Sequence, residues 1–335
     1  MDITSYLTPF KYGKSILSPS GKEGAFDRYG VDCPFVFRHL GKTYLMHVGF
    51  DGTGYQTALT VCEDDTLLHW RSLGVILPRG ERGHWDASGR AGIWLLSQDD
   101  IHKERTLKKV NGRYWMFFHS YPGEGYETGA AEMGLAWCED EDLLTWHPLD
   151  HPVYSWKDGA AWEKGGLYKC CAVEKDGRYY MFYNAKNVTE GFWHEQTGFA
   201  VSDDLLHWQR GADEPVIKVT EGAWDCHFAS DPFVVYDSKK DIWVMFYFGL
   251  GKRHAQEGIA LSRDLIHWEK YPEPIITAGE EGAIDSTHAH KPAVIQLNGI
   301  LYHFYCAVRG VKDEEEQAKF GNEFRSITVA RSIPF

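Results

Sequence analysis

Two aspartates of this 335-residue chain stand where acid–base chemistry is expected, just before apolar segments that resemble β-strands. Asp32 lies in VDCPFVF and Asp231 lies in SDPFVV. If these carboxyl groups face each other across a narrow channel, each perturbs the pKa of the other, as acid–base catalysis requires. The structural alternative is that each aspartate only caps the turn before its strand.

A third acidic residue would complete a catalytic set, and the candidates are Asp100, Glu104 and Glu163. Glu163 ends a phrase that recurs along the chain. Because a residue needed in every repeat more often ties neighbouring units together, this position counts against a unique role for it. It is the only glutamate in that series, so its carboxyl group reaches further than the aspartates in the other copies.

The densest polar cluster is the segment THAHK at 287–291. Alternate residues of a strand point the same way, so His288 and His290 are expected on one face, with Lys291 beside them. These side chains could ligate a metal ion, bind phosphate or hydrogen-bond to sugar hydroxyls; core histidines paired with carboxylates are the structural alternative. We expect no required cofactor, and a channel-bound metal ion near His290 is the alternative.

Further substrate-binding candidates flank the predicted strands. His102 holds the position in the second repeat that Asp32 holds in the first. Tyr55, Trp193 and Arg253 follow the second strands of their repeats. Exposed aromatic side chains next to acids and amides suit stacking on sugar rings, although such residues also anchor loops.

One short phrase recurs five times and divides the chain into five units. Its copies end at steps of 59, 77, 62 and 60 residues, which are long for a helical solenoid and suit a propeller blade with its loops. The copies are EGAFD (23–27), RGHWD (82–86), GAAWE (159–163), EGAWD (221–225) and EGAID (281–285).

Each unit predicts four antiparallel strands. An apolar strand, a turn with LGK, DGR or NGI and an aromatic-rich strand are followed by a third strand, a corner ending in Trp and a short fourth strand. The fifth unit lacks its fourth strand, and 15–19 near the N-terminus parallels the missing piece. We therefore predict an all-β, five-bladed propeller formed by one domain, 1–335, and closed by the N-terminal strand. The expected blades are 20–78, 79–155, 156–218, 219–278 and 279–335 with 14–19.

The composition narrows the partners. A formal net charge of −13 argues against binding nucleic acid or an anionic membrane surface, and no apolar run approaches the ~20 residues of a membrane span. The 15% aromatic content suits a protein that handles sugars. Seven cysteines, an odd number, and an N-terminus without an apolar signal core predict a cytoplasmic protein. The oligomeric state is left open.

The repeated plan resembles the five-bladed β-propeller glycosidases, namely glycoside hydrolase family 43 with relatives in families 32, 68, 117 and 130. It combines a Trp-Asp phrase, a Pro-started strand, a Gly turn, an aromatic strand and the corner D-L-x-H-W, from Ser15 to Ser332. For family 43 the resemblance implies an inverting hydrolase with Asp32 as general base, a second aspartate that tunes pKa and orients substrate, and a glutamate as general acid. It also implies a histidine at the channel, which His290 matches.

The chain departs from that pattern at the acid, because Leu167 stands where the glutamate of the family would fall and Asp-Pro occurs in the fourth unit, at Asp231. The sequence therefore predicts a glycoside hydrolase that uses two carboxyl groups on an oligosaccharide or glycoside. One alternative is a phosphorylase of the family 130 type, binding phosphate through Lys291, His288, His290 and Arg253. The other is a non-catalytic propeller that binds glycans.

Overall fold

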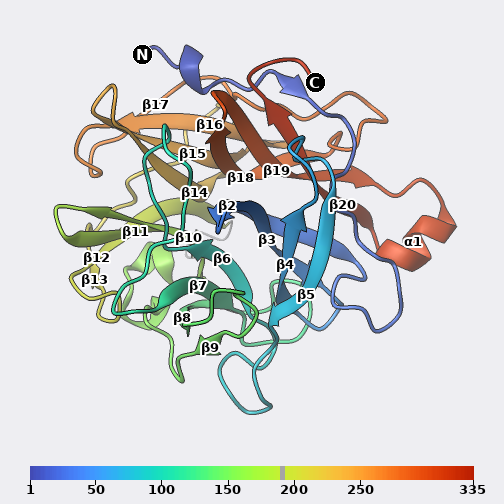
Figure 1. The fold of residues 1–335 in the computed structure, drawn as a ribbon, viewed down its shortest axis with the longest axis horizontal. Coiled ribbons are helices and arrows are strands. Elements are labelled where there is room, and N and C mark those ends of the chain that lie inside the picture. The colour runs from blue at the N-terminus through green and yellow to red at the C-terminus, as the bar shows by residue number, and fades with distance from the viewer. Residues whose placement is uncertain (189–192) are drawn as a thin grey trace.

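The computed structural model describes residues 1–188 and 193–335, and its architecture is all-β (Figure 1). Within these residues the one α-helix is the short α1 (Glu314–Phe320), and single 3-10 turns lie at Thr4–Tyr6, Trp156–Asp158 and Ala161–Glu163. The strands lie around a common centre and follow one another around it in chain order, as the colours of Figure 1 show.

In the part of the chain that the structure describes, β2 to β20 form five antiparallel groups. The first contains β2 (Gly30–His39), β3 (Lys42–Phe50), β4 (Tyr55–Cys62) and β5 (Trp70–Leu77). The second contains β6 (Ala91–Leu95), β7 (Tyr114–Ser120), β8 (Glu132–Cys138) and β9 (His147–Pro148). The third contains β10 (Leu167–Lys175), β11 (Arg178–Asn187), β12 (His194–Ser202) and β13 (Gln209–Arg210). The fourth contains β14 (Phe228–Asp237), β15 (Ile242–Leu250), β16 (Ala255–Ser262) and β17 (Glu269–Lys270), and the fifth β18 (His288–Leu297), β19 (Ile300–Gly310) and β20 (Glu323–Arg331).

The N-terminal strand β1 (Phe10–Lys11) completes the fifth group by pairing antiparallel with β20. Leu17 adds a further bridge to Ile327. The fourth group has the same pattern, in which β17 pairs with β16 and Ile276 bridges Glu257. The predicted segment 15–19 thus contributes Leu17, while the regular pairing begins earlier in the chain, at Phe10.

The repeated phrase ties strands together through its final acid. In the fourth group, Asp225 Oδ2 accepts from Tyr247 at 3.1 Å and from Lys270 at 2.6 Å. In the fifth group, Asp285 Oδ2 accepts from Tyr305 at 2.9 Å and from Lys11 at 2.6 Å, so β1 supplies the cation that β17 supplies next door. Each acid is at most 3% exposed, which explains why a cation and a hydroxyl group must accompany it.

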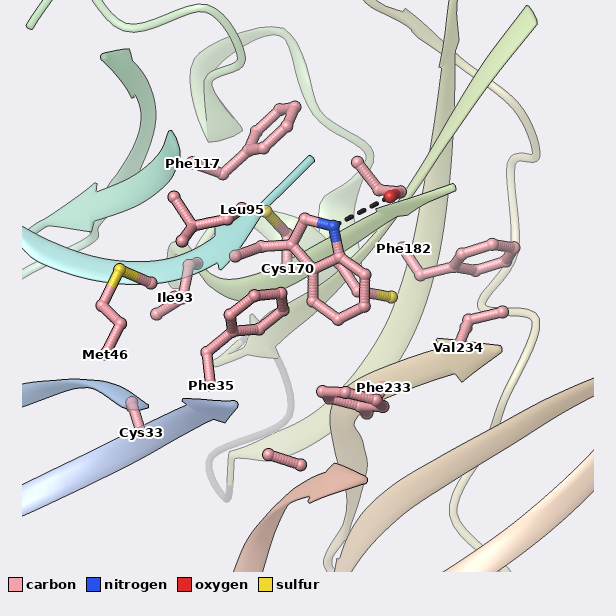
Figure 2. Close-up of a cluster of buried hydrophobic side chains, with 14 of the residues drawn as sticks. Cys33, Phe35, Met46, Ile93, Leu95, Phe117, Cys170, Phe182, Phe233 and Val234 are labelled. Atoms are coloured by element: carbon pink, nitrogen blue, oxygen red, sulfur yellow. Dashed lines mark hydrogen bonds between the residues drawn. The ribbon is translucent and has the colours of Figure 1, made fainter. Parts of the chain in front are cut away.

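Aromatic side chains fill the centre beneath the strand starts. Trp94 meets Phe35 and Phe233 edge-on, each at a centroid distance of 4.9 Å, and its indole donates to the Ala172 carbonyl at 2.9 Å (Figure 2). The buried Arg105 guanidinium lies 4.8 Å from the Phe233 ring centroid. This packing closes the centre, so a ligand that enters from the strand starts meets a floor.

The second group differs from the sequence prediction. Its first strand is β6, which ends before His102, and 105–110 makes only isolated bridges. The apolar run AGIWL fills the central core, whereas RTLKKV places Lys108 and Lys109 in partly or fully exposed positions. The residue equivalent to Asp32 is therefore Gly92 and not His102, and in the third group it is Tyr168 and not Leu167.

Candidate functional site

A cavity of about 210 Å³ lies where the first strands begin. Parallel bridges join the groups there, for example Glu195 of β12 with Phe228 of β14 and Arg325 of β20 with Gly30 of β2. Side chains from all five groups consequently converge on one space. Its polar lining includes Tyr55, His119, Tyr121, Tyr126, Glu127, Tyr168, Lys169, Asn184, Glu195, Asp231, His288, His290, Lys291 and Arg325.

Two repeated backbone positions aim residues into this cavity. The first is a bulge in each first strand, where extra residues interrupt the register with the second strand. Before proline the bulge residue adopts a left-handed conformation, with φ of 49°, 51° and 65° at Cys33, Asp231 and Lys291. A bulge re-aims its side chain, and the five bulge residues are Cys33, Ile93, Lys169, Asp231 and Lys291.

The second repeated position is the start of the third strand. The residue at this position forms a parallel bridge to the beginning of the first strand in the next group. Glu195 pairs with Phe228, Ala255 with His288, and Arg325 with Gly30. Tyr55 holds the same place in the first group, because its carbonyl accepts from the Arg90 amide. Tyr55, Glu195, Ala255 and Arg325 all line the cavity, so this position contributes one hydroxyl, one carboxyl and one guanidinium group.

Asp32 is engaged by two cations and by the backbone. Its Oδ2 accepts from Lys291 at 2.6 Å and from Arg325 at 3.0 Å, and its Oδ1 accepts from the Cys33 amide at 2.8 Å. Burial acts to raise the pKa of this carboxyl group, but Lys291 and Arg325 hold it well below its usual range. Asp32 therefore stays ionised and positions the two cations. Lys291 and Arg325 line the cavity, and Asp32 lies behind them.

The two predicted histidines are neutral groups. Arg325 donates to His290 Nε2 at 3.2 Å, so the proton of that ring is on Nδ1 and points to the Cys306 carbonyl at 3.3 Å. Burial, assisted by Arg325, lowers the pKa of His290 well below its usual value. His288 Nδ1 accepts from the Ala255 amide at 3.0 Å, and burial lowers its pKa to about 4. The backbone therefore occupies the Nδ1 side of His288, and a ligand would meet the other edge of the ring.

Asn184 links two carboxyl groups on the cavity wall. Its Nδ2 donates to Glu195 Oε2 at 2.9 Å and to Asp231 Oδ1 at 2.8 Å. These two oxygens are therefore no more than about 6 Å apart. Asn184 Oδ1 is buried without a partner among the described residues, and it faces a cavity in which a ligand hydroxyl could donate to it.

Glu195 has the protonation behaviour of a general acid. Burial and the negative charge of Glu127 together raise its pKa to about 7, although Lys186 opposes both. Burial also raises the pKa of Asp231, although Lys291 and Lys169 act to lower it. Glu195 is thus substantially protonated at neutral pH while a cavity-lining neighbour, the half-buried Glu127, remains reachable by water.

Neutral polar and aromatic groups complete the walls. Burial, with Lys291 and Lys169, lowers the pKa of His119 to about 3, and its Nδ1 has no partner among the described residues. The Tyr55 hydroxyl group is likewise buried and unpaired there. Trp193 is 47% exposed at the rim and stacks on Phe228 with an interplanar angle of 10°. Such groups bind the hydroxyls and apolar faces of sugars.

Of the residues that the sequence singled out, Tyr55, Trp193, Asp231, His288, His290 and Lys291 line the cavity. Glu163 lies elsewhere, where it accepts from Tyr183 at 2.5 Å and lies 3.2 Å from Arg210 Nε. Its position is that of the structural acid in the repeated phrase, as Asp225 and Asp285 also show.

Four further candidates also lie away from the cavity lining. Glu104 is exposed next to Arg38, and His102 Nε2 lies 2.8 Å from Asp237 Oδ1. Asp100 hydrogen-bonds to the His102 amide, and Arg253 is exposed in the loop before β16. Glu104, His102 and Asp100 became candidates because the sequence alignment placed the first strand of the second group ten residues too late.

The sequence prediction missed Glu195, Asn184, Lys169, Glu127 and Arg325. For Glu195 a signal existed, because it stands three residues before Gly198 in EQTGFAVS, and Ala255 stands three before Gly258 in AQEGIALS. An acidic residue that occurs at this position in only one repeat indicates a role that the repeated fold does not require. No comparable signal marks Glu127, which lies in the loop between β7 and β8.

No group of three or more His, Cys, Asp or Glu within residues 1–188 and 193–335 is arranged to hold a metal ion. At His290 both ring nitrogens already have partners, and a guanidinium group occupies the Nε2 side. The donor set there does not fit a cation. The expectation that no cofactor is required stays a prediction.

A family model now adds to this geometry. The model described as "Glycosyl hydrolases family 32 N-terminal domain" matches residues 105–317, more than half of the chain. The chain belongs to this family. It is a glycosidase, and the cavity with its buried carboxyl groups is its candidate active site.

Solved structures agree with this assignment. The glycosidase is 30% identical to the protein in a structure described as a complex of BT0996 and RGII, with a TM-score of 0.81 over 99% of this chain and 94% of the other. A structure named "Glycoside hydrolase" is also 30% identical, with a TM-score of 0.80 over 98% and 93% of the two chains. These matches span nearly the whole glycosidase.

A curated relative matches a shorter part. The "1,2-beta-oligomannan phosphorylase" of Thermoanaerobacter sp. (strain X514) is 30% identical over 129 residues, which cover 36% of the glycosidase and 42% of that protein. The glycosidase thus spans less than half the length of this relative. Separately, the described part of the glycosidase contains no helix that is long and apolar enough to cross a membrane.

Proposed function

We propose that this glycosidase hydrolyses a glycosidic bond of an oligosaccharide or glycoside in the central cavity, with Glu195 as the general acid. The observation that carries the proposal is a buried cavity carboxyl group whose pKa is raised to about 7. A carboxyl group that is protonated near neutral pH donates its proton to the leaving oxygen, whereas an ordinary glutamate is ionised there.

Glu127 is the proposed second carboxylate. It lines the cavity next to Glu195, and its half-buried position lets it contact water. In the reaction Glu195 gives its proton to the glycosidic oxygen while the bond from that oxygen to the anomeric carbon breaks. Glu127 takes a proton from a water molecule, whose oxygen bonds to the anomeric carbon.

Asp231 is assigned a supporting part. Its negative charge raises the pKa of Glu195, and the shared Asn184 amide fixes both carboxyl groups. Asp32, which the resemblance to family 43 implied as the base, has both oxygens engaged behind the cavity wall. Its geometry supports a positioning role for Lys291 and Arg325.

The inverting course expected from the sequence remains a prediction. Inversion needs carboxyl groups roughly 6.5–9.5 Å apart and retention roughly 5–5.5 Å. The nearest oxygens of Glu195 and Asp231 are no more than about 6 Å apart, so that pair suits retention. Inversion requires the carboxyl groups of Glu195 and Glu127 to be the wider pair. Proton NMR of the first-formed anomer distinguishes the two courses.

A phosphorylase is the second candidate, because Lys169, Lys291 and Arg325 all line the cavity and a curated relative is a phosphorylase. Inorganic phosphate would then replace water as the attacking group. Arg253 does not support this candidate, since it lies outside the cavity lining.

The finer architecture is also a proposal. We infer that the five groups are the blades of a propeller, closed by β1 on β20, with the single domain and blade bounds given by the repeats. The equivalent cations Lys11 and Lys270 support this closure. A cytoplasmic location is supported by seven free cysteines, of which five are buried.

A screen of 4-nitrophenyl pyranosides and furanosides, each with and without phosphate, tests the activity. Nitrophenol release without phosphate supports hydrolysis, and release that depends on phosphate identifies the phosphorylase. The test variant is Glu195→Gln, which removes the proposed acid. The matched control is Glu104→Gln, which changes an exposed acid outside the cavity. Equal turnover by wild type and Glu195→Gln on alkyl glycosides would exclude Glu195 as the acid.

A further inference from the structure

Lys169 is a largely buried lysine that lines the cavity and makes no hydrogen bond or ion pair in the part of the chain that the structure describes. The residue is 4% exposed and lines the cavity at the bulge of β10. Among the described residues, no acceptor lies within hydrogen-bonding distance of its Nζ and no carboxylate lies within 4.0 Å. Buried lysines are almost always paired, because an isolated ammonium group in a poorly solvated site is costly.

The other buried lysines near the cavity show how unusual this is. Lys291 donates to Asp32 at 2.6 Å. Lys186 lies over the rings of Tyr168 and Trp193, at 5.0 and 4.5 Å from their centroids. Within residues 1–188 and 193–335 Lys169 has neither kind of partner, so its charge is open towards the cavity.

The surroundings of Lys169 define what can bind there. Its charge contributes to the lowered pKa of His119 and opposes the rise that burial causes in the pKa of Asp231, so it acts on both of these cavity-lining groups. Asp231 is the bulge residue of the next group, and one of its oxygens is held by Asn184. A lysine only donates hydrogen bonds and an ionised aspartate only accepts them, so the bulges of two neighbouring groups offer one donor and one acceptor to the same cavity.

We propose that Lys169 determines substrate specificity by donating to a hydroxyl oxygen of the sugar in the cavity, while Asp231 accepts from the neighbouring hydroxyl. This deepens the proposed function and rests on the same cavity. A sugar with two adjacent free hydroxyls satisfies both groups, and a sugar that lacks one of them leaves a buried charge unpaired, which enzymes discriminate against strongly.

The test compares wild type with Lys169→Met, which keeps length but removes charge, and with Lys175→Met, a lysine at the outer end of the same strand. KM and kcat are measured on the 4-nitrophenyl glycoside that the enzyme turns over and on its monodeoxy analogues. We expect Lys169→Met to raise KM about ten- to a hundredfold, as loss of a charged hydrogen bond does, and Lys175→Met to change neither constant.

Two further readouts separate binding from a structural role. Without ligand, Lys169→Met should raise the melting temperature by a few degrees, because an unpaired buried charge is removed. The analogue that lacks the hydroxyl read by Lys169 should be turned over equally by wild type and Lys169→Met. A lower melting temperature, an unchanged KM or additive losses from the variant and every deoxy analogue would each overturn the proposal.

Binding keeps this inference separate from the catalytic proposal. Free mannose, fructose and arabinose are tested for stabilising each variant against heat. A shift in melting temperature with wild type that Lys169→Met abolishes supports Lys169 even if no glycoside is hydrolysed. Equal shifts with both proteins contradict the role of Lys169 and leave the assignment of Glu195 untouched.

Discussion

Glu163 and Glu195 are two buried glutamates of the third strand group, and their surroundings differ. Glu163 is 0% exposed, and its oxygens accept from the Tyr183 hydroxyl group and the Ala160 amide, with Arg210 at 3.2 Å. Glu195 is 6% exposed, accepts a hydrogen bond from Asn184, and faces a cavity that also holds Glu127 and Asp231.

The difference teaches that burial alone does not make a carboxyl group reactive. Around Glu163 a cation and two donors satisfy the negative charge, so the residue stabilises the fold. Around Glu195 burial and like charges leave the negative charge poorly satisfied, which raises its pKa to about 7. One glutamate repeats the role of Asp225 and Asp285, and the other has no counterpart in the described parts of the repeats.

The largest expected effect is on catalysis. Glu195→Gln should lower kcat on alkyl glycosides by roughly 10²–10⁴-fold, because the general acid is lost, and should leave the melting temperature unchanged or higher. On 2,4-dinitrophenyl glycosides the loss should be much smaller, since that leaving group departs without a proton. Steady-state kinetics on both substrate types checks this, and equal losses on both would contradict the acid role.

The converse change tests Glu163. Glu163→Ala should lower the free energy of unfolding by about 3–5 kcal/mol, because Arg210 and Tyr183 lose their buried partner. Urea denaturation measures the loss. The folded variant should retain kcat within a fewfold of wild type. A stable Glu163→Ala protein without activity would reverse the comparison between the two glutamates.

The pH dependence of stability distinguishes the same pair. The pKa of Glu195 rises from 4.5 to about 7 on folding. Folding therefore binds protons at this residue, and its stabilising contribution is complete below pH 4.5 and is lost as pH rises through 7. The stability of wild type relative to Glu195→Gln should fall by about 3 kcal/mol between these values. A constant difference in urea denaturation across that range would exclude the raised pKa.

The smallest effect concerns the ties in the fourth and fifth groups. Lys11→Met and Lys270→Met should each lower the free energy of unfolding by about 1–2 kcal/mol, since each removes one hydrogen bond to a buried aspartate. Similar losses are expected because the two lysines make equivalent contacts. Thermal denaturation with Lys14→Met as the exposed control measures them. Full stability of Lys11→Met alone would show that β1 is not equivalent to β17.

The repeats made most of the fold predictable. The strand order within each group follows from alternating apolar runs and Gly turns, which are local signals. The second group misled the alignment because its first strand, AGIWL, is short and has no proline after its bulge residue, unlike β2, β14 and β18. The polar run RTLKKV, which follows, resembles the start of a strand but only bridges its neighbours.

The site was less predictable. Asp231, His288, His290 and Lys291 lie in the first residues of β14 and β18 and were found, because they interrupt apolar patterns. Asp231 joins Asn184 and Glu195 only when β14 lies parallel to β12, a pairing that no local pattern encodes. The role of Asp32 changed because Arg325 reaches it from 293 residues away. Charge neutralisation of this kind depends on tertiary contacts.

The pairing of β1 with β20 has a consequence for biosynthesis. Phe10 is made early and waits for Arg331, its partner, until more than 300 intervening residues have left the ribosome. Bringing such distant segments together is entropically expensive and slow. Until β20 is released, β1 and the edge of β2 lack their partner strand and are exposed to solvent, so the nascent glycosidase is prone to aggregation and depends on chaperones during that interval.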